Sequence, residues 1–393
     1  MLVHGGAEGR ATVLRRVLRA HRHAEPADGQ LLLNSPSSTH QALAVLVGCA
    51  LLACGGAPSE VSADAGADDA ADAAEDGGAP TDAAGDSLPT YDGTPADDGP
   101  VRPCTAPAAK ACVGGWCRIE AGTFLLGSDP DERFRNPNSE NRVSVTLTRA
   151  FLLQQFEATQ ADWLAHVPVN PSGDEGSVGD CIAADCPVGN VTWFEVLEFA
   201  NRKSAAEGLP KCFELHDCTK EVGYGMACKS VSLTAADVYA CSGYRLPTQA
   251  EWEYAARAGT LTAFYSGPIT PHLTTYCADD AALESVGWYC FNSGARTHRV
   301  GRKPPNPWCL YDVLGNAAEW VHDPYDGLGY GTEALTDPFG TIPPGIVTGK
   351  KNNHLRGGNA VSPAARCRAS AHTETPNFFR APSYGFRLAR TAP

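Results

Sequence analysis

Cysteines constrain the fold of this chain more than any other feature. Of its fifteen cysteines, thirteen lie between positions 104 and 367. No two of them form a Cys-x-x-Cys pair, which argues against thiolate zinc sites with their usual spacing. Clustered cysteines in an exported chain are typical of disulfides. Because thirteen is odd, at least one thiol is expected to be free or paired outside this region.

Some of the bridges have obvious candidates. Cys181 and Cys186 could close a small loop. Four further cysteines could staple one insertion: Cys212, Cys218, Cys228 and Cys241. The sequence does not determine which cysteines pair.

The apolar run ALAVLVGCALLAC, residues 42–54, predicts export. A run of about a dozen residues is too short for a transmembrane helix, which needs roughly 20, and it suits the h-region of a secretory signal. It ends in Leu-Leu-Ala-Cys-Gly, which resembles a bacterial lipobox. We therefore predict a leader over residues 1–54, lipidation of Cys54 and attachment to the outer membrane or cell surface. The alternatives are an ordinary signal peptide and a short core helix.

The negative charge of the chain belongs to one segment. Residues 58–100 contain twelve Asp or Glu and no Lys or Arg, whereas residues 101–393 carry 26 basic and 30 acidic side chains. The acidic segment is rich in Ala, Asp, Gly and Pro and has too few large apolar groups to fold, so we expect a disordered linker over residues 55–103. The nearly neutral remainder, residues 104–393, has no basic face to suggest nucleic acid as a partner.

Residues 104–393 are expected to form short elements. The stretches 119–129 and 143–155 have the alternation of β-strands. Three Thr-x-x-Asp/Glu patterns then predict helix starts with capping boxes, at Thr159, Thr192 and Thr248. Gly208 and Gly259 are the expected ends of the second and third helices.

These segments, in this order, resemble the sulfatase-modifying-factor family, whose best-known members are formylglycine-generating enzymes. The matching stretches are AGTFLLGSD, FEATQADW, PVGNVTWFEVLEFAN, GLPKCFEL, GYRLPTQAEWEYAARAG, NPWCLYDVLGNAAEWVHD and RGG…GFRLA, which run from about residue 119 to 389. The resemblance implies the formylglycine-generating-enzyme fold: a single compact α+β domain, related to C-type lectins, with little regular secondary structure.

The resemblance also implies a calcium site. The family builds it in an Asn/Asp-x-x-Gly-x-Ala-x-Glu segment, which here gives Asp312, Gly315, Ala317 and Glu319. Two carboxylates and two backbone carbonyls in a tight loop are oxygens of the kind that calcium prefers. The alternative is that Glu319 caps a neighbouring backbone group and no metal binds. A second family site would fall near Asn292.

The family's catalytic site is incomplete in this sequence. Formylglycine generators oxidise a cysteine of a client sulfatase with oxygen and copper(I), which two cysteines five residues apart hold. Here those positions carry Ser362 and Cys367, and Asn359 stands where the family usually has serine. Soft copper(I) prefers thiolates, and a serine hydroxyl is a poor ligand for it. Copper is therefore not expected to bind.

Two functions remain open. The first is a non-oxidase relative, anchored in a membrane, that binds an unknown protein, peptide or glycan, acts as a scaffold or has an uncharacterised activity. The second is a working oxidase that finds its second thiol elsewhere, at Cys309 or Cys290. Hydrolase and iron-oxygenase chemistry has no support, because no G-x-S-x-G, HExxH or HxxxHxE pattern occurs.

Overall fold

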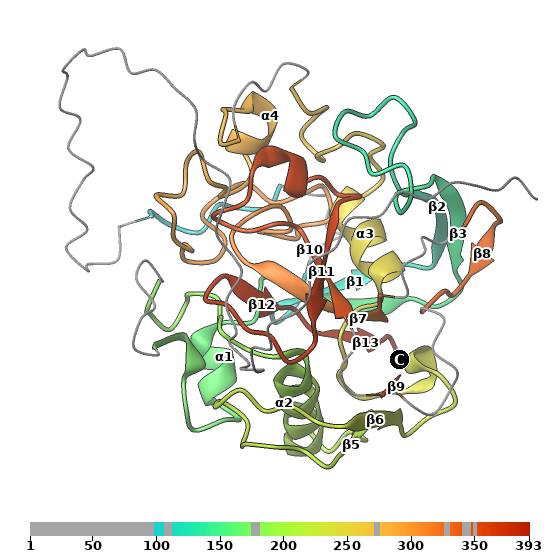
Figure 1. Ribbon diagram of the computed structural model, residues 1–393, viewed down its shortest axis with the longest axis vertical. Helices are drawn as coiled ribbons and strands as arrows, with labels where there is room; N and C mark the ends of the chain where they lie inside the picture. The colour runs from blue at the N-terminus through green and yellow to red at the C-terminus, as the bar shows by residue number, and fades with distance from the viewer. Residues whose placement is uncertain are drawn as a thin grey trace, which may run out of the picture. The chain divides into compact units, whose positions relative to one another are not determined.

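The computed structural model describes residues 98–105, 112–173, 181–270, 276–325, 331–339, 347–348 and 352–393. The expected leader, Cys54 and most of the expected linker lie outside these residues. Within them, four small β-sheets and short helices are joined by long loops (Figure 1). The α+β fold with little regular secondary structure, implied by the resemblance, is confirmed.

The largest sheet has four strands in the order β11-β10-β7-β12. These are β7 (Ala318–Pro324), β10 (Asn352–Arg356), β11 (His372–Pro376) and β12 (Tyr384–Phe386). β12 runs parallel to β7, and the other pairs are antiparallel. Every residue of β7 is buried. Its neighbouring residues Trp320 and Val321 belong to two different hydrophobic clusters, because successive side chains of a strand point to opposite faces.

Three further sheets have three strands each. The first joins both ends of the domain: β1 (Trp116–Ile119), β4 (Phe151–Gln154) and β13 (Ala389–Thr391). The second contains β2 (Gly122–Leu126), β3 (Val143–Leu147) and β8 (Leu335–Thr336). The third contains β5 (Phe213–His216), β6 (Ser230–Leu233) and β9 (Val347–Thr348). The strands expected in 119–129 and 143–155 are therefore present.

The helices begin where the capping boxes predict. They are α1 (Gln160–Leu164), α2 (Trp193–Ala206), α3 (Gln249–Arg257) and α4 (Ala281–Glu284), with 3-10 turns at Pro171–Gly173, Val238–Ala240 and Ala364–Arg366. Thr159, Thr192 and Thr248 each cap a helix with a complete capping box. Gly208 and Gly259 follow α2 and α3 with φ of +70° and +91°, in the left-handed region that glycine adopts without strain.

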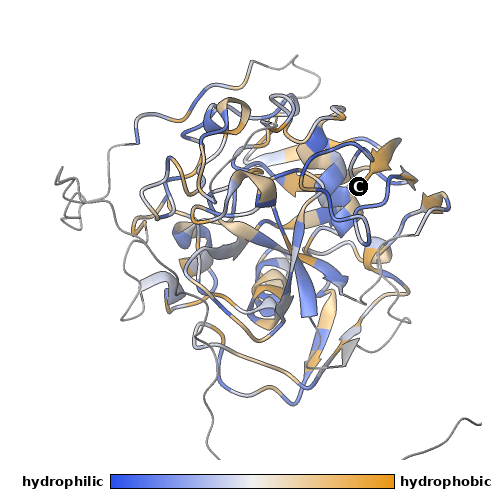
Figure 2. Ribbon diagram, turned by 45° about the horizontal axis from the view of Figure 1, so that its top comes forward, coloured by the Kyte–Doolittle hydropathy of each residue, from blue (hydrophilic) through white to orange (hydrophobic). Residues whose placement is uncertain are grey.

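The two hydrophobic clusters hold the elements together. One contains Trp193 and Phe199 of α2 with Trp320 and Phe386 of the four-stranded sheet. The other contains Trp252 of α3 with strands β1, β3 and β4. Hydrophobic and hydrophilic residues share the same short elements in Figure 2, as expected for elements that bury one face.

Six disulfides staple the loops. The pairs are Cys104–Cys309, Cys112–Cys117, Cys181–Cys186, Cys212–Cys241, Cys218–Cys228 and Cys277–Cys290. The small loop at Cys181–Cys186 and the stapled insertion are therefore confirmed. The odd thiol among the thirteen cysteines is Cys367.

Candidate functional site

The Ser362–Cys367 segment follows β10 through two glycines. Gly357 and Gly358 adopt φ of +85° and +67°, which turns the chain sharply out of the sheet. The Ser362 hydroxyl then donates to Asn359 Oδ1 (2.8 Å) and accepts from the Asn359 backbone N–H (3.1 Å). The Ser362 carbonyl accepts from the N–H of Cys290 (3.1 Å). The serine at the family's first copper position therefore hydrogen-bonds within its own loop.

Cys367 is sealed inside the domain. Its side chain is fully buried, and burial raises the pKa of its thiol far above the usual range. A methyl group added to Gly358 would lie 2.6 Å from the Cys367 sulfur, so the backbone closes directly over it. Because the thiolate is the nucleophile and the metal ligand, this environment disfavours both roles.

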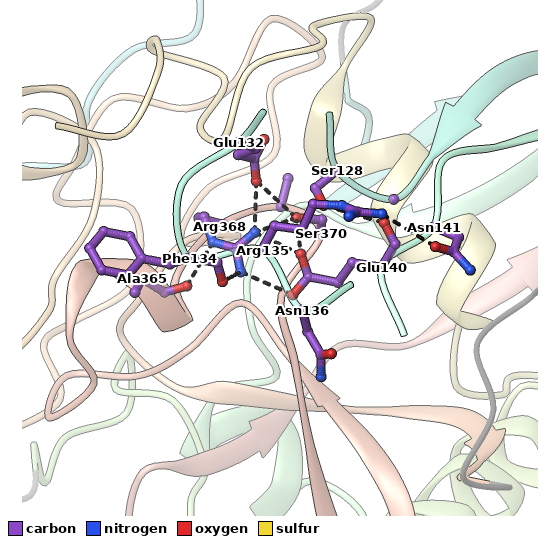
Figure 3. A network of polar contacts seen from close by, with 12 residues as sticks. Ser128, Glu132, Phe134, Arg135, Asn136, Glu140, Asn141, Ala365, Arg368 and Ser370 are labelled. Atoms are coloured by element: carbon purple, nitrogen blue, oxygen red, sulfur yellow. Dashed lines mark hydrogen bonds and ion pairs between the residues drawn. The ribbon is translucent and has the colours of Figure 1, made fainter. Parts of the chain in front are cut away.

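The neighbouring Arg368 locks the same segment in place (Figure 3). Its guanidinium donates to Glu132 (2.7 Å) and to both carboxylate oxygens of Glu140 (2.7 and 2.9 Å), and further to the Phe134 carbonyl (2.7 Å). Burial would raise the pKa of Glu140, but the bond and charge of Arg368 hold it below its usual value. The loop before β3 is thereby fixed to the residues that follow Cys367.

Neither alternative second thiol is available. The expectation that Cys309 or Cys290 might complete a copper site is wrong, because Cys309 is bonded to Cys104 and Cys290 to Cys277. Among the described residues Cys367 is the only free cysteine. One buried thiol does not supply the two-sulfur site that copper(I) requires, so the residues present do not fit this metal.

The residues expected to bind calcium lie in a buried carboxylate cluster, which we define as Glu157, Asp312 and Glu319. The guanidinium of Arg387 donates to both carboxylate oxygens of Glu319 (2.7 to 2.9 Å), and the indole N–H of Trp252 also donates to Glu319 (2.8 Å). Asp312 Oδ2 accepts from the backbone N–H of Gly301 (2.7 Å). Asp312 Oδ1 is buried and has no hydrogen-bond partner among the described residues.

Glu157 joins the cluster from a distant part of the chain. It accepts from the Ala317 backbone N–H (2.7 Å) and from the side-chain amide of Asn316 (2.6 Å). Of these three carboxylates, only Glu319 is bonded to a guanidinium, that of Arg387. Burial, and then the charges of Asp312 and Glu319, raise the pKa of Glu157 well above its usual value. Burial raises the pKa of Asp312 to about 6.

The sequence prediction did not include Glu157 or Arg387. Both sit inside stretches that carry the family resemblance, FEATQADW and GFRLA, and that was the only signal for them. Nothing local to either residue indicates its partner, which lies 160 positions away for Glu157 and 68 for Arg387.

The cluster suits calcium only in part. Asp312 Oδ1 is an available hard oxygen in a surplus of negative charge. Glu319, in contrast, already directs its carboxylate at Arg387 and Trp252. No group of three His, Cys, Asp or Glu side chains in the described ranges is arranged to hold a metal ion. Asn292, near the expected second site, uses its amide to bond the backbone of Tyr289 and Gly287.

The loops that meet at Ser362 expose apolar side chains. Phe291 and Val361 are 48% and 46% exposed, and their loops are joined by the Cys290–Ser362 backbone bond. Asn359 also bonds Ser383 (3.0 Å), at the end of a loop that exposes Phe378 and Phe379. Exposed apolar side chains mark an interaction surface where they form a contiguous patch.

These features define an α+β domain held by disulfides, and bridges of this number are typical of proteins in oxidising compartments. No helix in the described ranges is long and apolar enough to cross a membrane. Residues 103–392 match the family described as "Sulfatase-modifying factor enzyme 1-like domain". The chain belongs to this family.

Its relatives have diverse names. It is 30% identical to "Chaperone protein LppX" of Paenibacillus barcinonensis over 51% of this chain and 69% of that protein. It is 26% identical to the formylglycine-generating enzyme of Bos taurus over 69% and 73%. Among solved structures, the Treponema denticola variable protein 1 covers 70% of this chain and 94% of its own, with 28% identity and a TM-score of 0.54. PvdO from Pseudomonas aeruginosa covers the same shares at 21% identity and a TM-score of 0.52, which supports the fold alone.

Proposed function

We propose that this chain is an exported, membrane-anchored binding protein that uses the sulfatase-modifying-factor fold without its oxidase chemistry. One observation carries the proposal: the family's two copper positions hold a serine bonded to Asn359 and a thiol sealed beneath Gly358. The loops around them expose apolar side chains instead of a reactive sulfur. The partner is a protein, peptide or glycan.

The anchor in this proposal is the lipid on Cys54, and the tether is the expected linker, residues 55–103. The prediction of disorder is wrong for its last residues, because Asp98 bonds His298 (2.9 Å). A lipobox-like sequence at the end of an apolar run supports the anchor, and the excess of acidic residues supports an extended, self-repelling tether. Six disulfides support an oxidising location outside the cytoplasm.

Calcium is the metal we propose for the buried carboxylate cluster. The unpartnered Asp312 Oδ1 and the surplus of two carboxylates over Arg387 support it. The backbone carbonyls of Gly315 and Ala317 would be further ligands. A bound dication would balance charge that is otherwise relieved by protonation.

An oxidation assay tests the proposal. The full-length protein is incubated with copper(I), oxygen and a peptide containing Cys-x-Pro-x-Arg, with a formylglycine-generating relative as the positive control. We expect no aldehyde in the peptide by mass spectrometry. Aldehyde formation that disappears in Cys367→Ser would overturn the proposal.

A further inference from the structure

A second candidate site lies between β2, β3 and the C-terminal end of α3, which are neighbours in Figure 1. A cavity of about 410 Å3 opens there, and none of its lining residues belongs to the Ser362–Cys367 segment or to the buried carboxylate cluster. Its volume falls within the range of small-molecule sites, about 300 to 1,000 Å3. No part of the function proposed above uses it.

Three aromatic rings form one wall of the cavity. The ring of Tyr254 lies 5.0 Å from that of Phe124 and 4.9 Å from that of Trp308, measured between centroids. Gly122 makes room for this arrangement, because a methyl group there would lie 2.3 Å from the Tyr254 hydroxyl. All three rings are partly exposed, so they offer apolar surface to a ligand.

The loop that carries Trp308 is fixed in place. The Asn306 amide donates to the carbonyls of Ala255 and Ala256 in α3 (2.7 and 3.1 Å), and its oxygen accepts from the Trp308 N–H (2.9 Å). The next residue, Cys309, is bonded to Cys104. The aromatic wall is therefore held before a ligand arrives, which lowers the entropy cost of binding.

Hydroxyl groups line the same cavity. Ser144 and Tyr254 each contribute a hydroxyl to its lining. The Thr260 hydroxyl donates to the Arg257 carbonyl (2.8 Å) and keeps its own lone pairs for a donor. These groups suit a ligand that both donates and accepts hydrogen bonds.

The cavity presents no unpaired charge. Among the described residues, Arg257 is the only charged one that lines the cavity. Its guanidinium donates to Glu253 (2.8 Å), to the Gly127 carbonyl (2.7 Å) and to the Thr262 carbonyl (3.1 Å), so every nitrogen is used. A charged ligand would lose hydration there without gaining a partner.

We propose that this cavity binds an uncharged saccharide. The rings would stack against the C–H faces of a sugar, to which the electron-rich face of an aromatic ring is attracted. The hydroxyls of Ser144, Tyr254 and Thr260 would bond the sugar hydroxyls. This inference rests on the proposed role as a binding protein and selects a glycan as the ligand class.

Saturation-transfer NMR on the full-length protein tests it, with cellobiose and N,N′-diacetylchitobiose as uncharged disaccharide probes. We expect transfer to the ring protons of at least one probe, with a Kd on the order of 1 mM. Trp308→Ala should weaken binding at least about tenfold, which corresponds to about 1.4 kcal/mol. Tyr254→Phe and Ser144→Ala keep the aromatic wall. Each should weaken saccharide binding about threefold, a size expected for one hydrogen bond. Tyr224→Ala, at an exposed aromatic residue outside the cavity, is the matched control.

The outcomes separate the two proposals. No transfer to either disaccharide, transfer that survives Trp308→Ala in a folded variant, or a preference for an acidic disaccharide or an apolar peptide overturns the saccharide site. Near-ultraviolet circular dichroism establishes that each variant is folded. Aldehyde formation in the oxidation assay would overturn the proposed function and leave the saccharide result unchanged.

Discussion

The Cys367 sulfur lies directly beneath Gly358, where even a methyl group would come within 2.6 Å of it. The same glycine has a φ of +67°, so two independent constraints keep this position free of a side chain. In a copper oxidase of this family the corresponding cysteine must reach a metal and a substrate. Here the loop that carries Ser362 closes over it, and the thiol is part of the core.

The sealed thiol should resist modification. Because burial raises the pKa of Cys367 far above its usual range, the thiolate should be absent up to pH 9. We expect iodoacetamide to label Cys367 only after denaturation, as measured by peptide mass spectrometry. The denatured protein is the positive control. Labelling of the native protein at pH 8 would show that the Gly358 loop opens.

Arg387, which carries the single guanidinium bonded to the buried carboxylate cluster, should contribute more to the free energy of unfolding than any one carboxylate of the cluster. Arg387→Met leaves three carboxylates unbalanced and should lower the free energy of unfolding by about 3–5 kcal/mol, the range for breaking a buried ion pair. Glu319→Gln leaves two carboxylates to balance Arg387 and should cost less.

Urea unfolding of both variants measures these costs. The exposed Arg118–Glu120 pair is the control, since Glu120→Gln should cost less than about 1 kcal/mol. If Glu319→Gln lowered the free energy of unfolding as much as or more than Arg387→Met, the view that Arg387 balances the carboxylates would be contradicted.

Stability should depend on pH through Asp312. Its pKa is raised by burial from 3.8 to about 6, so the folded state binds this proton more tightly than the unfolded chain. The stabilising contribution is therefore complete below pH 4 and is lost as pH rises to about 6 and beyond. In EDTA, Asp312→Asn should gain stability relative to the native protein between pH 4.5 and 7.5. A difference in urea midpoint between the native protein and Asp312→Asn that does not change with pH would rule out this role of Asp312.

Calcium bound to the buried carboxylate cluster should restore the stability that is lost as pH rises. At pH 7.5, millimolar calcium should raise the unfolding temperature of the native protein, because a ligand that binds only the folded state stabilises it. Asp312→Asn should lose the effect, and magnesium, which demands octahedral geometry, should give a smaller one. Differential scanning calorimetry measures the shift. An equal response of the native protein and Asp312→Asn, or no response, would exclude calcium at this cluster.

The parts of the fold that could be predicted from sequence are those that depend on neighbours in the chain. The capping boxes at Thr159, Thr192 and Thr248 involve residues three positions apart, and all three are present. The Cys181–Cys186 bridge likewise closes a loop of five positions. Such pairs are close in the sequence, which made them candidates before the structure confirmed them.

The parts that could not be predicted depend on distant contacts. Cys104 and Cys309 are 205 positions apart, and Glu157 meets Ala317 across 160. No periodic pattern in the sequence predicts contacts between residues so far apart. The presence of Ser362 and Cys367 in one loop followed from the family resemblance, but the bond from Ser362 to Asn359 and the burial of the thiol required the structure.

The most direct test of the central claim is the binding of copper(I) to the full-length protein, measured by competition with a chromogenic chelator under reducing-agent-free conditions that keep the disulfides intact. Because the Cys367 thiol is buried and Ser362 is a poor ligand, we expect no tight binding of copper(I). The native protein and Cys367→Ala should give identical titrations. Retention of one equivalent of copper that is lost in Cys367→Ala would contradict the account.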